Sequence, residues 1–287
     1  MKEVSSMIKK FLMLLAVVGS VLASGCFENG TMLLLNKDGS GKIIARNYIN
    51  DAGGLGALGG LGAALGAEAG EEVEMPDIAA GIKEAMENAA GSFGEGVELV
   101  SIKAVNNKLG WKGYEGVYSF PDVTKIKFKA VENALGDADG GVATEFNNSD
   151  MSYTIKFTPG DTSTLELLAE LPDEEAGGDG ADEVDAADMN NPQMMAMMAP
   201  MFAGMRMSYM IKVNGDITDT NARYVNKSNS SILVADIQMD KLLQNQEAMQ
   251  ALMAGGGKNP DFEKLDQMDI PGLKMQNPTK ALKISFK

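Results

Sequence analysis

Residues 31–49 read TMLLLNKDGSGKIIARNYI, and this stretch sets the expected fold. Two β-prone runs, 31–35 and 43–49, flank the polar segment 36–41. That segment contains an Asp-Gly pair and a second glycine. A tight turn between strands needs the positive φ that glycine adopts without steric cost. We therefore predict a β-hairpin over residues 31–49.

The same polar segment also resembles the start of a calcium-binding loop. Oxygen-bearing side chains stand at alternate positions (Asn36, Asp38 and Ser40) and are followed by Gly41. The twelfth position of such a loop is Asn47, where calcium loops need a bidentate glutamate, and the flanks have the pattern of strands instead of helices. We favour the hairpin and keep a calcium-stabilised module, using Asp38 and the acidic run described below, as an alternative.

Beyond the hairpin, short apolar runs alternate with polar turns. The alternation predicts further strands over residues 97–105, 110–120, 153–157, 165–171, 207–213, 222–225, 232–237 and 281–286. Turns are expected at residues 214–216, 226–229 and 270–274. Within 110–120, the side chains of Tyr114, Tyr118 and Phe120 should share one covered face.

Three segments have the apolar periodicity of helices. Residues 77–90 begin after Pro76, and residues 239–253 end at three glycines. A methionine-rich segment follows Asn191-Pro192 and places six side chains on one helical face, namely Met194, Met195, Met198, Met201, Phe202 and Met205. We expect this pliable face to pack on the sheet, with copper(I) binding as the alternative. The predicted fold class is α+β, an antiparallel sheet built from hairpins with two to three packed helices.

Two insertions lack such patterns. Residues 53–66 contain seven glycines and predict a flexible insertion, with a mobile apolar flap touching lipid as the alternative. Residues 173–188 hold eight acids and no base, so 173–190 should be a disordered linker. It separates an N-terminal portion, 26–172, from a C-terminal portion, 191–287, and the two portions are compatible with one shared sheet.

The first 25 residues have the pattern of a secretory signal. Lysines precede an apolar run, 11–22, which as a helix would span about 18 Å. A bilayer core needs about 30 Å, so the run is too short for a permanent span. Small residues then lead into Cys26, the only cysteine of the chain. This pattern resembles the bacterial lipobox, which implies cleavage before Cys26 and acyl chains such as palmitate on it. By the same resemblance, Phe27 in place of Asp implies the outer membrane where a cell has two.

Composition restricts the classes of function. The formal net charge of the chain is −15, and residues 1–25 carry +2, which leaves −17 on the remainder. Such a surface repels nucleic acid and anionic headgroups, so we expect no nucleic-acid partner, and membrane contact should come from the anchor or from apolar surface. Histidine is absent, which removes the commonest general base and transition-metal ligand. No catalytic motif stands out, so we expect no enzymatic activity, catalytic residue, cofactor or metal site.

Two short motifs suggest a family. One is the 36–41 segment soon after the lipobox, and the other is residues 210–217 (MIKVNGDI) with Asn221 and the later run 232–234. Together they resemble the domain of LppM-type bacterial lipoproteins. The resemblance implies an α+β domain similar to lipid-transfer folds that binds lipid or glycolipid at the cell envelope. No ligand-binding residue is carried over from it.

We therefore expect a non-enzymatic lipoprotein of the bacterial cell envelope, anchored to a membrane through Cys26. Its body should bind a lipid-like ligand or an envelope protein. The alternatives are a structural or assembly lipoprotein without a ligand, and the calcium-stabilised module.

Overall fold

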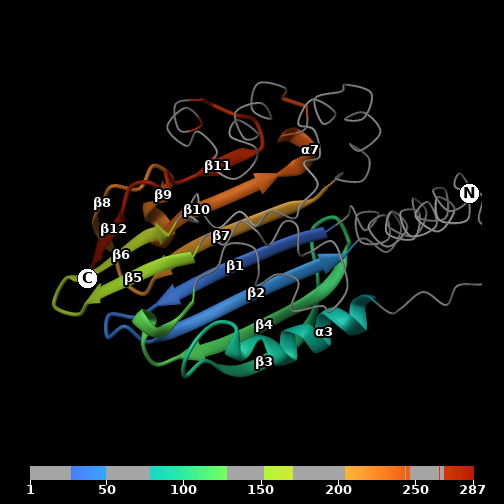
Figure 1. Cartoon of the computed structure of the whole chain (residues 1–287), viewed down its shortest axis with the longest axis horizontal. Coiled ribbons are helices and arrows are strands. Elements are labelled where there is room, and N and C mark those ends of the chain that lie inside the picture. The colour runs from blue at the N-terminus through green and yellow to red at the C-terminus, as the bar shows by residue number, and fades with distance from the viewer. Residues whose placement is uncertain are drawn as a thin grey trace, which may run out of the picture.

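The computed structural model describes residues 27–49, 78–127, 152–170, 204–242, 244–245, 265 and 268–287. These residues form two sheets (Figure 1). The larger sheet has the strand order β11-β10-β7-β1-β2-β4-β3, and β9 pairs with β10. The smaller sheet has the order β5-β6-β12-β8.

Each sheet combines strands that are far apart in the sequence. The larger sheet consists of β1 (Phe27–Leu35), β2 (Gly41–Ile49), β3 (Glu98–Asn106), β4 (Lys112–Phe120), β7 (Arg206–Val213), β9 (Val225–Asn226), β10 (Ser231–Gln238) and β11 (Leu273–Met275). The smaller sheet consists of β5 (Ser152–Thr158), β6 (Ser163–Glu170), β8 (Ile217–Thr220) and β12 (Leu282–Phe286). Its central pair, β6 and β12, joins segments that are more than a hundred residues apart in the sequence.

The predicted hairpin over residues 31–49 is confirmed. Strands β1 and β2 pair antiparallel from Phe27↔Ile49 to Leu35↔Gly41. Gly39 in the turn has a φ of 88°, and the Asn36 N–H donates to the Ser40 carbonyl at 2.8 Å. The 31–35 and 43–49 runs therefore form strands because the glycine supplies the turn and alternate side chains find one buried face.

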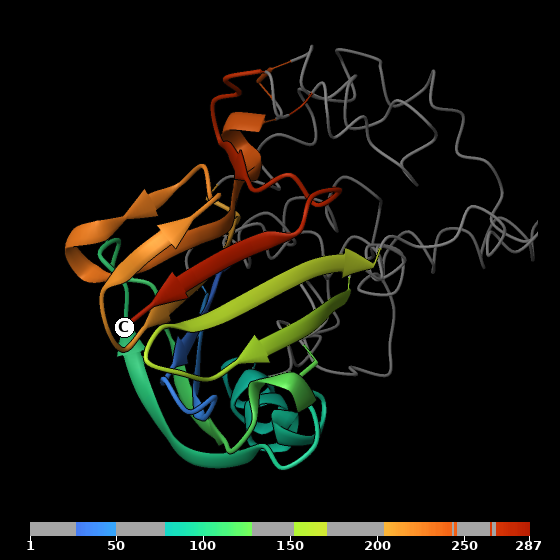
Figure 2. The same ribbon diagram turned by 90° about the vertical axis from the view of Figure 1, so that its left-hand side faces the viewer.

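Alternation also decides which side of the larger sheet is covered. The inner face carries Leu33, Ile43 and Tyr118, all fully or almost fully buried, as predicted for the Tyr118 side of its strand. The smaller sheet packs on this face with Leu165 and Phe286, both 0% exposed (Figure 2). We call the opposite side the outer face.

A helix also covers part of the inner face. The helix α3 (Ile78–Asn88) agrees with the prediction over 77–90 and continues into the 3-10 turn η1 (Ala89–Gly91). It packs on β4, where the Tyr118 hydroxyl donates to the Met86 carbonyl at 2.5 Å. Burial raises the pKa of Tyr118 to about 12. The ring of Phe93 lies 4.7 Å from that of Tyr118 and extends the core past the end of the helix.

The predicted α+β class with two to three packed helices is wrong for the described residues, which are mostly β. Among them only α3 is longer than one turn, because α7 (Met239–Leu242) has four residues and η2 (Val123–Lys125) and η6 (Lys227–Asn229) are isolated 3-10 turns. Within the helix predicted over 239–253, residues 244–245 are described and are not helical. Residue 243, residues 246–253 and all but Met205 of the methionine face lie outside the described residues. The prediction relied on helical periodicity in these segments. In the described residues, the core of the larger sheet is covered mainly by the smaller sheet instead of by several helices.

The sheet is also not purely antiparallel. β7 runs parallel to β1, from Glu28↔Arg206 to Leu35↔Val213. Sequence reasoning paired neighbouring strands into hairpins, whereas β1 lies between its hairpin partner β2 and a strand from residue 206 onward. A parallel partner needs a long connection and leaves no local turn signal.

Two smaller expectations are wrong at their edges. A strand was predicted over 222–225, but only Val225–Asn226 forms one, because side chains hold this backbone in place of a ladder: the Arg223 N–H donates to Gln276 Oε1 at 2.9 Å. The turn predicted over 270–274 is confined to Pro271 and Gly272, and Leu273 already pairs with Ile237 in β11.

The strand starts and ends that flank the undescribed segments gather at one end of the fold. Phe27 pairs with Ile49, Glu28 lies beside Arg206, and Ser152 pairs with Glu170. The turns at the opposite end meet each other, since the Ser163 hydroxyl donates to the Lys37 carbonyl at 2.9 Å. We call the end that contains Phe27 the N-terminal end.

Candidate functional site

The residue predicted to carry the lipid precedes the first strand directly. Cys26 itself lies outside the described residues, and Phe27 is the first residue of β1. Consecutive Cα atoms are 3.8 Å apart across a trans peptide bond. β1 is an inner strand of the larger sheet, between β7 and β2, so any group on Cys26 is linked to the middle of this sheet.

The outer face near this end carries a band of charged and polar side chains that crosses six strands. We call this band the polar belt; it consists of Glu28, Arg46, Tyr48, Lys103, Glu115, Arg206, Ser208, Asp236 and Gln238. These side chains lie in two neighbouring cross-strand rows, because the ladder registers bring them opposite one another.

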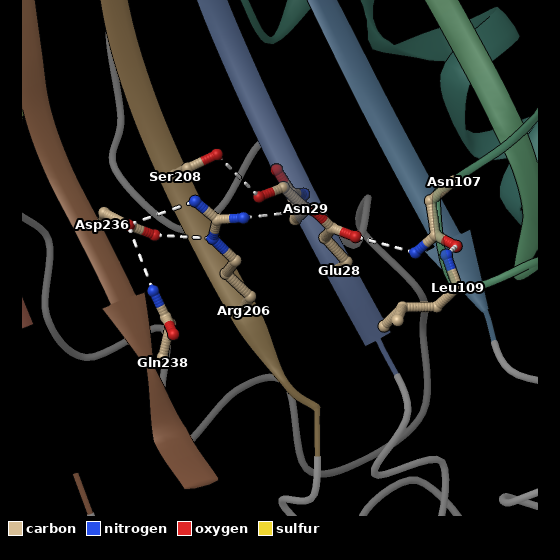
Figure 3. Close-up of polar contacts among 8 residues, drawn as sticks. All are labelled: Glu28, Asn29, Asn107, Leu109, Arg206, Ser208, Asp236 and Gln238. Carbon is tan, nitrogen blue, oxygen red and sulfur yellow. Dashed lines mark hydrogen bonds and ion pairs between the residues drawn. The ribbon is translucent and has the colours of Figure 1, made fainter. Parts of the chain in front are cut away.

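Arg206 and Asp236 form the most buried part of the polar belt. The guanidinium donates twice to the carboxylate, from Nε to Oδ1 at 2.7 Å and from Nη2 to Oδ2 at 3.1 Å (Figure 3). The Asp236 side chain is only 9% exposed, and that of Arg206 is 43% exposed. The hydrogen bond from Arg206 to Asp236 raises the pKa of Arg206. Gln238 adds a third donor to Asp236 at 3.3 Å.

Glu28 joins this pair to the turn between β3 and β4. Its Oε1 lies 3.7 Å from Nη1 of Arg206, and its Oε2 accepts a hydrogen bond from Asn107 Nδ2 at 2.8 Å (Figure 3). The other amide atom of Asn107, Oδ1, accepts from the backbone N–H groups of Leu109 and Trp111, both at 2.9 Å. One glutamate two residues after Cys26 therefore contacts both β7 and the β3–β4 turn.

The second ionic group of the polar belt centres on Glu115. Arg46 Nε lies 2.6 Å from its Oε2, and Lys103 Nζ lies 2.8 Å from its Oε1. Burial acts to raise the pKa of Glu115, but the hydrogen bonds from Lys103 and Arg46 outweigh it, so the pKa is below its usual value. Glu115 is therefore a carboxylate at neutral pH, shared by two cations from neighbouring strands.

The polar belt has two chemical capacities. Its ion pairs link β10, β7 and β1 in one group and β2, β4 and β3 in another. The side chains of Arg46 and Arg206 are 42% and 43% exposed, and arginine is suited to binding an anionic group. Among the described residues, no group of three or more acids, histidines or cysteines could hold a metal ion. The carboxylates Glu115 and Asp236 each already contact a cation.

A row of apolar side chains adjoins the polar belt on the outer face. The register aligns one residue from each of five neighbouring strands, each partly exposed; we call Leu233, Met210, Met32, Ile44 and Val117 the apolar row. Partly exposed apolar side chains aligned across several strands form a contiguous apolar strip.

The inner face carries a buried amide pair near the same end. Asn29 Nδ2 donates to Asn47 Oδ1 at 2.8 Å, and both residues are 2% exposed. Among the residues that the structure describes, none gives Asn29 Oδ1 a hydrogen bond, so this buried acceptor could accept one from water or a ligand. Asn47 is the residue that occupies the twelfth position of the candidate calcium loop, and it points into the fold.

The loop of the calcium alternative is a turn stabilised by its own side chains. Asp38 Oδ1 accepts from the backbone N–H and the hydroxyl of Ser40, at 3.0 and 2.7 Å. These bonds lower the pKa of Asp38, with the side-chain bond making the largest contribution. Asn36 and Ser40 also contact each other at 3.0 Å, so the three candidate ligands serve the hairpin turn.

The remaining sequence-predicted regions lie outside the described residues: Cys26 and the signal, the Gly-rich run 53–66, the linker 173–190, and the methionine face except Met205. Met205 contributes a backbone contact, since its carbonyl accepts from the Met239 N–H at 3.0 Å. A small pocket lined by Tyr224, Met268, Met275 and their neighbours has room for about one water molecule, far less than an acyl chain needs.

Sequence reasoning missed the polar belt. One signal was available, because Asp236 interrupts the apolar strand 232–237 and a charge in such a strand is almost always paired. The sequence did not identify its partner, because Arg206 lies 30 residues before Asp236. Glu28, which contacts Arg206, lies 178 residues before Arg206.

Comparisons with known proteins add little. No protein-family model matches the chain, and no curated protein does. A search of solved structures finds the NMR structure of the Mycobacterium tuberculosis LppM folded domain, with a TM-score of 0.29 and 9% identity over 91% of this chain and 89% of that one. That similarity is too low to carry an argument about this chain. Among the described residues, no helix is long and apolar enough to cross a membrane.

Proposed function

We propose that this protein is a bacterial envelope lipoprotein, anchored to a membrane by acyl chains on Cys26, whose folded body binds other molecules and catalyses no reaction. The observation that carries the proposal is the start of β1 at Phe27, one residue after a lipobox-like cysteine. The body thus follows the proposed anchor without a spacer. Bacterial lipoproteins carry several acyl chains, and more than one chain is needed for stable anchoring.

Labelling tests the anchor directly. The full chain, expressed in a bacterium fed labelled palmitate, should incorporate label and partition into detergent, and a Cys26→Ser variant should do neither. The matched control Ser24→Ala changes a neighbouring small residue and should retain the label. An unlabelled wild-type chain in the aqueous phase would refute the anchor.

The apolar row and the polar belt together support an envelope protein as the molecule that the body binds. A contiguous apolar strip beside partly exposed guanidiniums has the mixed character of protein interfaces, where aliphatic residues and arginine meet. A photo-crosslinking residue at Ile44 should capture a stoichiometric partner in cells. The same residue at Leu168, which is exposed on the smaller sheet, should not.

A lipid-like ligand is the second candidate, and Asn29 favours it because its buried acceptor faces the interior near the N-terminal end. Native mass spectrometry of the detergent-extracted protein should then show a co-purifying lipid. An Asn29→Leu variant should lose that lipid while retaining the Ile44 crosslink. Absence of any bound lipid in the wild type would remove this candidate and leave the protein partner.

A further inference from the structure

The turn between β3 and β4 presents an apolar side chain to solvent. Leu109 is 70% exposed, more than any other large hydrophobic side chain among the described residues. Exposed lysines stand on either side, Lys108 and Lys112, and residues 106–113 (NNKLGWKG) contain no acid in a chain whose net charge is −15. The turn is a local exception to the acidic character of the protein.

The geometry of this turn is fixed. The Asn107 N–H donates to the Trp111 carbonyl at 3.0 Å, and Asn107 Oδ1 accepts from the N–H groups of Leu109 and Trp111. Gly110 has a φ of 81°, a conformation that other residues rarely adopt. The indole of Trp111 packs on Gly204, where an added Cβ would lie 2.5 Å from the ring. These hydrogen bonds and the conformation of Gly110 therefore hold Leu109 in its exposed position.

The turn is also attached to the start of β1. Asn107 Nδ2 donates to Glu28 Oε2 at 2.8 Å, and Glu28 is two residues after Cys26 (Figure 3). Two residues of extended chain span at most about 7 Å. A bilayer anchored at Cys26 would thus lie against the same end of the fold that carries Leu109 and its lysines.

We propose that the β3–β4 turn is a second membrane contact, in which Leu109 enters the headgroup region and Lys108 and Lys112 lie at the level of anionic phosphates. This inference rests on the anchor proposed above. A leucine flanked by lysines suits an anionic bilayer surface, because the apolar side chain gains from burial and each nearby lysine gains from the surface potential. Together with the anchor, this contact would fix the orientation of the body on the membrane, and with it the orientation of the outer face.

A chemical tether allows the membrane contact of the turn to be tested separately from the acylation of Cys26 in cells. Because Cys26 is the only cysteine, the chain from residue 26 onward, which contains every described element, can be coupled through that thiol to maleimide lipid in vesicles. Trp111 is the only tryptophan and lies two residues from Leu109, so quenching of its fluorescence by brominated acyl chains reports docking of the turn. Vesicles of phosphatidylcholine with phosphatidylglycerol are compared with phosphatidylcholine alone.

The wild-type chain should be quenched on the phosphatidylglycerol vesicles, and added salt should weaken the quenching. Leu109→Asp should lower the ratio of docked to undocked protein about tenfold. Lys108→Gln should lower it about fivefold. The control Val100→Asp replaces a 54% exposed side chain on β3 near the opposite end and should leave the ratio unchanged.

Equal quenching of the Leu109 and Val100 variants, or no quenching of the tethered wild type, would overturn the inference. Far-UV circular dichroism of each variant checks that it is folded, and Lys108→Gln provides a second test if Leu109→Asp is not. Failure of palmitate labelling in cells would refute the anchor without affecting the vesicle result. Failure on vesicles would leave the palmitate result intact.

Discussion

Asp236 and Glu115 lie in the same cross-strand row of the outer face, four strands apart. Both are buried carboxylates that contact partly exposed cations. Removing a buried charge and removing its exposed partner are therefore different perturbations. The first leaves a partly exposed cation, and the second leaves a buried carboxylate without its compensating charge.

Arg206 and Asp236 test this asymmetry. Arg206→Met should lower the free energy of unfolding by about 3 kcal/mol, because Asp236 then stays buried without its cation. Asp236→Asn should cost only about 1 kcal/mol, since Arg206 is 43% exposed and keeps Glu28 nearby. Urea denaturation measures both values. The double variant should be more stable than Arg206→Met alone, and equal costs for the two single variants would contradict the argument.

Glu115 should make stability depend on pH. Its folded-state pKa is below that of the unfolded chain, about 4.3, so its contribution is fully present above that value and is lost as the pH falls through the folded-state pKa. We expect Glu115→Gln to cost about 1 kcal/mol at neutral pH, because the side chains of both partner cations are partly exposed, 42% for Arg46 and 63% for Lys103. The difference from wild type, measured by urea denaturation, should shrink below about pH 4. A constant difference across that range would rule out the ion pairs as its source.

At the scale of single elements, two glycines differ in the space around them. An added side chain would meet close packing at one and open space at the other. Gly113 on β4 lies against β2, and an added Cβ would be 1.9 Å from the Asn47 carbonyl oxygen. Gly81 lies within α3, and an added Cβ there would meet nothing within 4 Å. The same substitution should therefore have opposite effects in the two elements.

Gly81→Ala should raise the free energy of unfolding by about 1 kcal/mol, because alanine loses less backbone entropy in a helix. Gly113→Ala should lower it by more than about 2 kcal/mol, since the β2–β4 ladder must shift to admit the methyl group. Thermal denaturation of both variants beside wild type checks the two signs. A stabilising Gly113→Ala would mean that β2 and β4 are less closely apposed than the register indicates.

At the scale of the whole molecule, the smaller sheet depends on the last described strand. β12 lies between β6 and β8, and its Ile284 and Phe286 are fully buried against the larger sheet. Its register with β6, Leu282↔Leu167 to Phe286↔Ser163, joins residues more than a hundred positions apart in the sequence. Closing such a long loop costs entropy that only packing between the sheets offsets.

Phe286→Ala should lower the free energy of unfolding by about 3–5 kcal/mol, a large part of the 5–15 kcal/mol typical of a domain. Both sheets should lose structure in one transition, because they share one core. Denaturation followed at the same time by Trp111 fluorescence, which reports the larger sheet, and by far-UV circular dichroism tests this. Two separate transitions would show that the sheets fold independently. Leu168→Ala, which truncates an exposed side chain of the smaller sheet, is the matched control and should change stability by less than about 0.5 kcal/mol.

Local signals in the sequence determined the elements of this protein. Asp38-Gly39 and its flanking runs specified the first hairpin, alternation specified the covered side of β4, and the periodicity after Pro76 specified α3. Each of these signals acts within about ten residues, where turn conformation and side-chain direction are set by the backbone itself. The lipid anchor at Cys26 is likewise a local motif and stays a prediction.

Only the tertiary structure decided which strands are neighbours. The parallel pair of β1 and β7, the interleaving of late strands into both sheets, and the polar belt join residues up to 178 positions apart. Alternation specifies the face on which a side chain lies but not the strand beside it, because strand pairing depends on how whole surfaces fit together. For the same reason, the turn beside the proposed anchor was visible in the sequence only as a turn, and its position next to Glu28 follows from the fold.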